Sequence, residues 1–196
     1  AQTTSEQRSG GGLVGSMGTL QTDHGQIQVG EFHHNEDFIN GSNGNASEHA
    51  VFKGPLGFSF DIRDTFAVPD IARNAEMMNE AWQRSQYACD VDGIVSVDPV
   101  FIQKMVEING NVTLENGTVL TSENTAEYML NTIYKEVPVS LQDTYFEYIA
   151  STIMNKAFSN MDIAKMMKVA QSIGELTKNR HFYAYTFHDD EAKYFQ

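Results

Sequence analysis

The sequence predicts a single α/β domain, an α-β-α sandwich in which helices cover both faces of a central mixed sheet. Segments in which apolar and polar residues alternate, as in β-strands, are interspersed along the chain with segments of helical periodicity. No repeat or internal linker divides the chain, and 41% of its 196 residues are hydrophobic, which is enough for a core. Residues 1–12 are polar and end in glycines, so we expect a flexible lead-in there and the domain over residues 13–196.

Short apolar runs predict the strands. The runs 13–20 and 27–32 flank Asp23-His24-Gly25, which is typical of a hairpin turn. A second hairpin is predicted over 111–120, because Asn116-Gly117 separates two short apolar runs. Further strands are expected at 56–62, 91–97 and 181–187.

The predicted strand 56–62 matters for function. Phe58, Phe60 and Ile62 alternate along it, and Arg63 and Asp64 follow at its end. Ligand-binding residues of open α/β sheets tend to lie at strand ends. A guanidinium there can hold a phosphate by two parallel hydrogen bonds, and a carboxylate can hold Mg²⁺. The structural alternative is a simple ion pair that anchors a loop.

Helical periodicity and capping residues predict the helices. A stripe of Ile71, Ala75, Met78 and Trp82 predicts a helix over 70–85. Asp98 followed by Pro99 is typical of a helix start, and Asn109-Gly110 would end that helix. Further helices are expected over 123–134, 140–158 and 161–173, the last ended by Gly174. We interpret the stripe Leu141, Tyr145, Ile149 and Ile153 as core.

The segment 33–47 is rich in Asn, Gly, Asp, Glu and His. It is too polar to pack and too long for a tight connection. We therefore expect an exposed loop that is functional or mobile.

Charge excludes one large class of function. Asp and Glu number 26 against 13 Lys and Arg, which gives a formal net charge of −13, the wrong sign for binding nucleic acid. The single Cys89 allows no internal disulfide, and no apolar run approaches the length of a membrane helix. The chain begins Ala1-Gln2 without a signal region, which we interpret as a fragment of a longer protein.

The order of several motifs resembles a known bacterial family, the domain of unknown function 4012. The resemblance extends over residues 6–187 and rests on Arg8-Ser9-Gly10-Gly11-Gly12, Ile62-Arg63-Asp64-Thr65, the stretch 91–99, and Leu120-Thr121-Ser122-Glu123-Asn124. Members look like extracellular portions of proteins with an N-terminal membrane helix, often from Gram-positive bacteria and often near genes for surface polysaccharides. The resemblance implies a location at the cell surface, with a membrane anchor outside this chain.

More remotely, the same order resembles the LytR-CpsA-Psr family, which transfers glycopolymers from a polyprenyl-pyrophosphate carrier to peptidoglycan with Mg²⁺. Arg8 matches one motif of that family and Arg63-Asp64-Thr65 another, while Gly10 replaces an aspartate. Lys135 lies where the family has arginines. The resemblance implies that Arg63, Arg8 and Lys135 bind phosphate and that Asp64 binds the metal.

Two hypotheses follow. The first is an envelope domain that binds a glycan, a polyprenyl-linked precursor or a partner protein of surface-polymer assembly. The second is a Mg²⁺-dependent phosphotransferase of the LytR-CpsA-Psr type. The first is favoured because the chain has no arginine between Arg84 and Arg180, where the transferases neutralise pyrophosphate. Open apolar volume around Met78, Trp82, Phe101, Ile149 and Ile153 would indicate lipid binding, whereas close packing would indicate an interaction domain.

Overall fold

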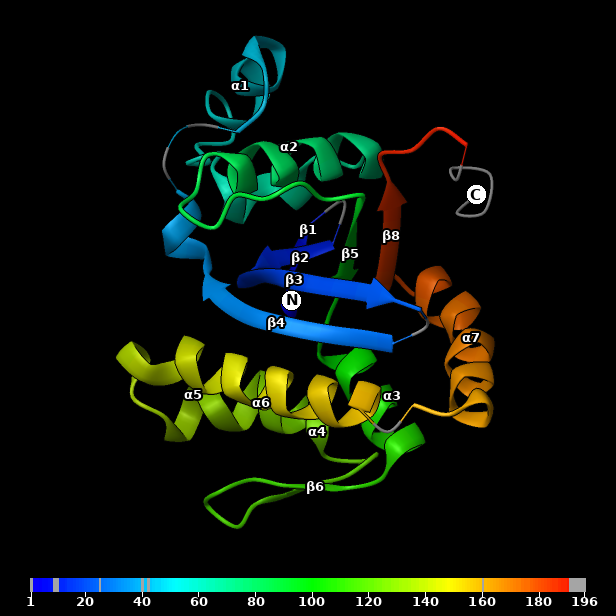
Figure 1. Cartoon of the computed structure of the whole chain (residues 1–196). Coiled ribbons are helices and arrows are strands. Elements are labelled where there is room, and N and C mark those ends of the chain that lie inside the picture. Colours follow the sequence, from blue (N-terminus) through cyan, green and yellow to red (C-terminus); the bar gives the residue numbers. More distant parts are fainter. Residues whose placement is uncertain are drawn as a thin grey trace. The chain divides into compact units, whose positions relative to one another are not determined.

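The computed structural model describes residues 2–8, 11–24, 26–39, 41, 43–159 and 161–190, without the side chains of 2–8 and 11. The structure is mixed α/β, as predicted (Figure 1). It divides into two compact units. The first contains Ala1–Gly15, His34–Ser96 and Tyr183–Gln196, and the second contains Ser16–His33 and Val97–Phe182.

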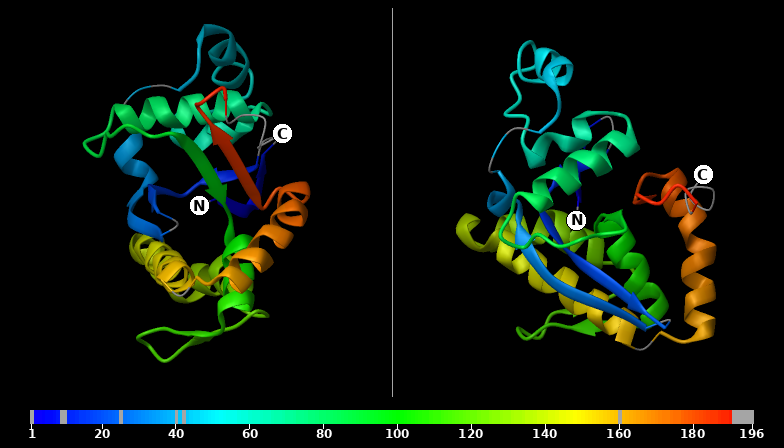
Figure 2. Two further views of the ribbon diagram at one scale, coloured as in Figure 1. Left: turned by 45° about the vertical axis from the view of Figure 1, so that its right-hand side comes forward. Right: turned by 45° about the horizontal axis from the view of Figure 1, so that its top comes forward.

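The first unit combines two strand pairs with short helices. Its elements are β1 (Gln2–Arg8), β2 (Gly11–Val14), the 3-10 helices η1 (Asn35–Phe38) and η2 (Ile62–Ala67), α1 (Ala46–Phe52), α2 (Ile71–Gln83), and most of β5 (Gly93–Val97) and β8 (Phe182–Thr186). β1 pairs antiparallel with β2, and β5 lies beside β8 (Figure 2). Helix η2 contacts β2, α2 and η1, so it is the central element of this unit.

Helix α2 confirms three of the four residues of the predicted stripe, while Ile71 at its start is 37% exposed. Asp70 caps it by accepting a hydrogen bond from the backbone N of Arg73, and Ala75, Met78 and Trp82 are buried. The ring of Trp82 stacks on Phe38 with centroids 5.7 Å apart. The core of the unit therefore forms between α2 and the segments that surround it.

The second unit is mainly helical. Its elements are β3 (Ser16–Asp23), most of β4 (Gln26–His34), α3 (Pro99–Asn109), β6 (Val112–Thr113), β7 (Val119–Leu120), α4 (Thr125–Glu127), the π-helix η3 (Tyr128–Thr132), α5 (Ile133–Glu136), α6 (Val139–Ser159) and α7 (Ile163–Lys178). Helix α3 contacts α4, α6 and α7, and its buried side chains include Phe101, Ile102 and Met105. Asp98 caps α3 as predicted, accepting hydrogen bonds from the backbone N of Val100 and Phe101.

The predicted hairpin 111–120 is confirmed by β6 and β7, which pair antiparallel with Val112 opposite Leu120. The predicted helix 123–134 is confirmed as the continuous run of α4, η3 and α5. That run ends at Val137, which is extended because Pro138 follows it. In the described residues, no helix has both the length and the apolar character to cross a membrane.

The predicted strand 56–62 is wrong. The chain makes a turn after α1, and Gly57 and Phe60 then adopt positive φ values of 66° and 54°, which a strand cannot contain. Phe58 and Phe60 alternate because they pack in an aromatic cluster with Phe52 of α1. Arg63 and Asp64 consequently lie in a 3-10 helix and not at the end of a strand.

The segment 33–47 also differs from the expectation that it is too polar to pack. It contains η1 and the start of α1, and Asn35, Phe38 and Asn43 are buried. The two asparagines pack because the folded chain satisfies their amide groups. For example, the Nδ2 atom of Asn35 donates to the carbonyl oxygen of Val14 at 2.8 Å.

The strands of the described residues pair two by two, as β1–β2, β3–β4, β5–β8 and β6–β7. The single central sheet that the alternation of strands and helices predicted is not confirmed by this pairing. Two-stranded sheets are too small to form a core by themselves. The helices therefore contribute most of the buried apolar side chains. Residues 1–12, expected as a lead-in, contain β1 and the start of β2.

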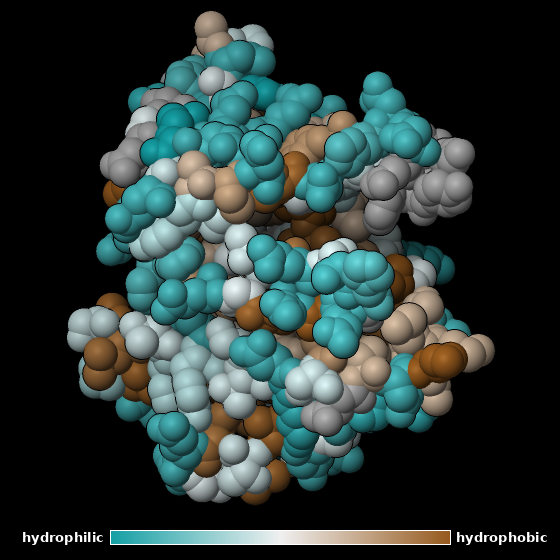
Figure 3. Space-filling view, viewed as in Figure 1, coloured by the Kyte–Doolittle hydropathy of each residue, from teal (hydrophilic) through white to brown (hydrophobic). Residues whose placement is uncertain are grey.

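The prediction that Gly174 ends a helix is wrong, because α7 continues to Lys178. Helix α7 has an exposed apolar side that carries Ile163, Met166 and Met167, and brown residues are visible over α7 in Figure 3. A Cβ atom at Gly174 would meet no atom within 4 Å. Neither packing nor backbone conformation therefore requires glycine at this position.

We predict that Gly174→Ala stabilises the protein by about 0.5–1 kcal/mol, because alanine loses less conformational entropy in a helix. Gly117→Ala is the matched control. Its Cβ would also meet open space, but Gly117 has a φ of 84° in the hairpin turn. The control should therefore destabilise the protein by about 1 kcal/mol. Urea unfolding measures both values, and shifts in the same direction would contradict the prediction.

Candidate functional site

Arg63 and Asp64 lie together in the first turn of η2, and Asp61 engages the arginine. The Nε atom of Arg63 donates to Oδ1 of Asp61 at 2.9 Å, and Nη2 donates to Oδ2 at 2.6 Å. The hydrogen bond from Arg63 to Asp61 raises the pKa of the guanidinium. The fork that could bind a phosphate is thus already occupied by a carboxylate of the same loop.

Asp64 is buried and supports the backbone. Its Oδ2 accepts a hydrogen bond from the backbone N of Phe60 at 2.8 Å, and only 6% of the residue is exposed. Phe60 has a left-handed conformation that costs a non-glycine residue about 1–3 kcal/mol. Asp64 helps to hold that conformation. Within the described ranges, no group of three or more His, Cys, Asp or Glu residues is placed to hold a metal ion.

Asn43 connects the loop before α1 to η2. Its backbone N donates to the carbonyl oxygen of Phe60 at 2.9 Å, and its Nδ2 donates to Oγ1 of Thr65, also at 2.9 Å. Its Oδ1 accepts from Nη2 of Arg84 at 3.2 Å, and its carbonyl oxygen contacts Nε2 of His49. The residue is fully buried, so these partners compensate for the loss of water.

Glu48 and Arg73 form a second ion pair in this unit. Nε of Arg73 donates to Oε1 of Glu48 at 2.7 Å, and Nη2 donates to Oε2 at 3.2 Å. Glu48 also completes the capping box of α1 with Asn45. The hydrogen bond from Arg73 lowers the pKa of the Glu48 carboxyl, and the same bond raises the pKa of Arg73. Both side chains are mostly buried, Glu48 with 14% exposed.

The other residues predicted to bind phosphate lie elsewhere in the chain. The backbone of Arg8 ends β1, where it pairs with Gly11, but its side chain lies outside the described part, as do Ser9 and Gly10. Lys135 is exposed on α5 of the second unit. Of the four predicted residues, only Arg63 and Asp64 are seen side by side.

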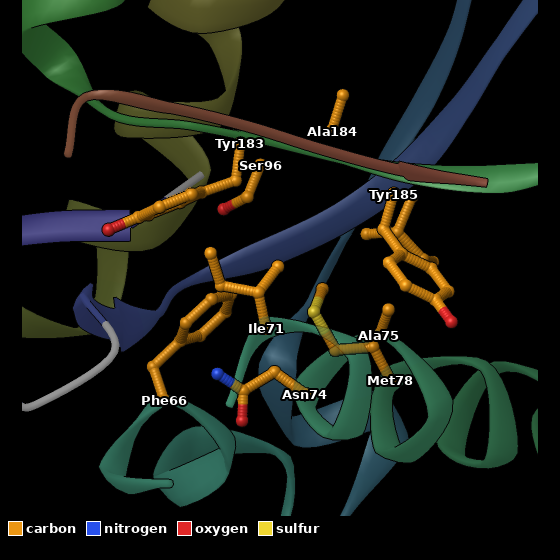
Figure 4. A pocket seen from close by; sticks show the side chains of 10 residues that line it. Phe66, Ile71, Asn74, Ala75, Met78, Ser96, Tyr183, Ala184 and Tyr185 are labelled. Carbon is orange, nitrogen blue, oxygen red and sulfur yellow. The ribbon is translucent and has the colours of Figure 1, made fainter. Parts of the chain in front are cut away.

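The first unit contains a small cavity between α2 and the β5–β8 pair (Figure 4). Its lining includes Ile71 and Met78 of α2 and Tyr183 and Tyr185 of β8. The cavity has a volume of about 10 Å³, which is the space of one water molecule. A polyprenyl chain does not fit there, so the packing around Met78 is that of an ordinary core.

A much larger cavity lies on the surface of the second unit, and sequence reasoning missed it. It is an open groove of about 430 Å³ between the hairpin turn and α6, which we call the tyrosine groove. Its lining residues are Glu115, Asn116, Leu141, Thr144, Tyr145 and Tyr148. The prediction that Leu141 and Tyr145 are core residues is wrong. The core part of that stripe begins only at Ile149, because Leu141 is 54% exposed and Tyr145 is partly exposed.

The hairpin turn orients the two tyrosines. Nδ2 of Asn116 donates to the hydroxyl of Tyr145 at 2.7 Å, and the backbone N of Glu115 donates to the hydroxyl of Tyr148 at 3.3 Å. The two ring centroids are 6.0 Å apart. Burial is the main cause that raises the pKa of Tyr145 to about 12, and a hydrogen bond with Tyr128 is the second cause. A phenol of ordinary pKa is already neutral at physiological pH, and this shift keeps Tyr145 neutral at higher pH as well.

The spacing of aromatic and polar residues on α6 is the signal that could have indicated this groove. Leu141, Thr144, Tyr145 and Tyr148 follow the spacing i, i+3, i+4 and i+7, which places them on one face of a helix. The missing information was the position of the hairpin, because Asn116 and Tyr145 are 29 residues apart in the sequence.

The chain matches a family model described as "Protein of unknown function (DUF4012)" over residues 1–134. It matches no curated protein and no solved structure. The match includes η2 with Arg63 and Asp64, and it also includes the hairpin turn with Glu115 and Asn116. The tyrosines on α6 lie beyond it.

We predict that Glu48→Gln destabilises the protein by about 1 kcal/mol at pH 7, because it removes the charge that Arg73 binds. The pKa of Glu48 in the folded state lies below its ordinary value of 4.5. The folded protein then binds fewer protons than the unfolded chain, so this stability is complete above pH 4.5 and is lost as the pH falls through the folded-state pKa.

Urea unfolding of wild type and variant at pH 7 and at pH 3 measures this effect. Glu76→Gln is the control, because Glu76 also pairs with Arg73, at 2.8 Å, but is 53% exposed. We expect a smaller loss from the control at pH 7. An equal loss for Glu48→Gln at both pH values would refute the electrostatic explanation.

Proposed function

This chain belongs to the DUF4012 family, and we propose that it is an extracellular cell-envelope domain that binds a glycan in the assembly of surface polysaccharide or cell-wall glycopolymer. The tyrosine groove carries this proposal. The location rests on the family resemblance, as does the expectation that a membrane anchor lies outside the chain. The α-β-α sandwich of the LytR-CpsA-Psr type also stays a prediction.

The groove has the composition that a sugar ring requires. The faces of Tyr145 and Tyr148 are apolar and carry the negative side of the ring quadrupole, which attracts the polarised C–H groups of a pyranose. Glu115, Asn116 and Thr144 offer hydrogen-bonding groups at the edge of the same groove. Its volume of about 430 Å³ falls in the ordinary range of ligand sites.

The glycan is favoured over the other ligands that the sequence suggested. A polyprenyl-linked precursor would need space for its lipid, and the cavity in the first unit holds only about 10 Å³. A transferase would need cations on its pyrophosphate. The guanidinium of Arg63 is instead held by Asp61. Phosphotransfer in this chain would therefore require Arg63 to release the carboxylate of Asp61, whose Oδ2 lies 2.6 Å from Nη2 of Arg63, and to bind the substrate instead.

Titration calorimetry with hexasaccharides of β-1,4-linked glucose, N-acetylglucosamine and galactose tests this proposal. We expect saturable binding of at least one of the three. Tyr148→Ala should weaken that binding about tenfold or more, because it removes half of the aromatic surface. Tyr148→Phe keeps the ring and should cost about three- to tenfold through the lost hydrogen bond.

The control is Tyr134→Ala, an identical substitution of an exposed tyrosine that does not line the groove. It should change the dissociation constant less than about twofold. Failure of all three hexasaccharides to bind would refute the proposal. An equal loss from Tyr134→Ala and Tyr148→Ala would place the binding site outside the groove.

A further inference from the structure

The geometry points to a restriction on the glycan: we propose that the tyrosine groove selects uncharged saccharides and rejects anionic ones of the same backbone. This inference rests on the proposed function and specifies its ligand. It concerns a property that envelope polymers differ in, since some are neutral and others carry carboxylates or phosphates.

The charge of the lining is the first argument. Glu115 is the one ionisable carboxylate among the six residues that line the groove, and none of the six is a lysine, arginine or histidine. An anionic sugar would therefore meet a negative side chain without a compensating cation. The whole chain adds to this repulsion through its formal net charge of −13.

The direction of the hydrogen bonds is the second argument. The hydroxyl oxygen of Tyr148 already accepts the backbone N–H of Glu115, so its own proton can be donated to a ligand. The carboxylate of Glu115 can only accept. A sugar hydroxyl both accepts and donates, so sugar hydroxyls can bond to the tyrosine as well as to the glutamate. A ligand carboxylate or phosphate only accepts, which leaves Glu115 facing a like charge.

The chemistry of Tyr145 is consistent with the same ligand. Its hydroxyl accepts from Asn116 and lies 3.4 Å from the hydroxyl of Tyr128. A tyrosine is neutral over the physiological pH range even at its ordinary pKa, and the raised pKa of Tyr145 keeps its ring and hydroxyl uncharged at higher pH as well. A ring that stacks there is bound by its faces and hydroxyl groups, without an ion pair.

Matched pairs of polymers test the selection. The probes are hydroxyethylcellulose with carboxymethylcellulose, glycol chitin with carboxymethyl chitin, and β-1,4-galactan with its carboxymethyl derivative. Each pair shares a class of backbone and differs in charge. Calorimetry of the intact chain at 20 mM and at 300 mM NaCl should show about tenfold or tighter binding of the neutral member at low salt. The difference should narrow at high salt, which screens the repulsion.

Glu115→Gln identifies the residue responsible. It removes the charge and keeps the shape, so it should raise the affinity for the anionic member severalfold at low salt and lower that for the neutral member, whose hydroxyl loses a charged acceptor. Glu123→Gln is the matched control, since Glu123 is exposed and does not line the groove. The control should leave both affinities unchanged.

The outcomes separate the two proposals. Neutral preference that Glu115→Gln reduces would support the selection. Equal or tighter binding of the anionic members would overturn it and leave glycan binding in place. Neutral preference that Glu115→Gln does not change would overturn the role of the groove charge. Failure of every neutral and anionic probe to bind would refute glycan binding itself.

Discussion

In the first unit, polar side chains form hydrogen bonds with backbone groups that are not paired in a β-sheet, and the fold of the unit depends on these bonds. Its strands form only pairs, and the chain between α1 and α2 contains no strand. Buried N–H and C=O groups in that segment need partners, since each unsatisfied group costs about 1–3 kcal/mol. The side chains of Asp61 and Asp64 accept the backbone N–H groups of Arg63 and Phe60, and the backbone N of Asn43 donates to the carbonyl oxygen of Phe60. Asp64 and Asn43 thus hold Phe60 in its strained conformation.

This use of polar side chains explains part of the acidic composition. Asp70, Asp98 and Asp162 each cap a helix, and Asp61 caps η2. Carboxylates at these positions are favoured because they accept orphan N–H groups and meet the positive end of the helix dipole. The excess of negative charge therefore stabilises the fold locally, while it makes the surface unsuited to anionic ligands.

The small number of cationic side chains also limits where a ligand can bind. Arginine is scarce, and Arg63, Arg73 and Arg84 are each engaged by acidic or amide groups of the first unit. A phosphate site built on Arg63 would have to break a bond that the loop uses. The tyrosine groove requires no cation, because aromatic faces and neutral hydrogen bonds suffice for a sugar. The composition of the chain and the geometry of the groove thus favour the same class of ligand.

Local signals predicted the helices well, and long-range contacts account for the errors. Asp70 and Asp98 indicated helix starts correctly because a cap involves only three or four neighbouring residues. The alternation at Phe58 and Phe60 indicated a strand, but its cause is an aromatic cluster with α1, which no local pattern reveals. Gly174 was expected to end a helix, yet packing of α7 against α3 extends the helix through it.

Local patterns also did not indicate the tyrosine groove, because it forms by a long-range contact between the hairpin turn and α6. The way in which these two elements hold the groove explains how it can select a ligand. Glu115 and Asn116 lie within the part of the chain that the family model matches, whereas Tyr145 and Tyr148 lie on α6 beyond it. The hairpin turn is closed by hydrogen bonds from the backbone N of Gly117 to the carbonyl oxygen of Leu114 at 2.9 Å and from the backbone N of Leu114 to the carbonyl oxygen of Thr118 at 2.8 Å. Helix α6 is fixed by the buried Ile149 and Ile153, which follow the groove residue Tyr148 by one and five positions. The aromatic rings are thus placed by a packed helix and oriented by a tight turn. Contacts within the chain hold both supports, so a ligand need not supply those contacts, and its binding free energy is available for selection between ligands.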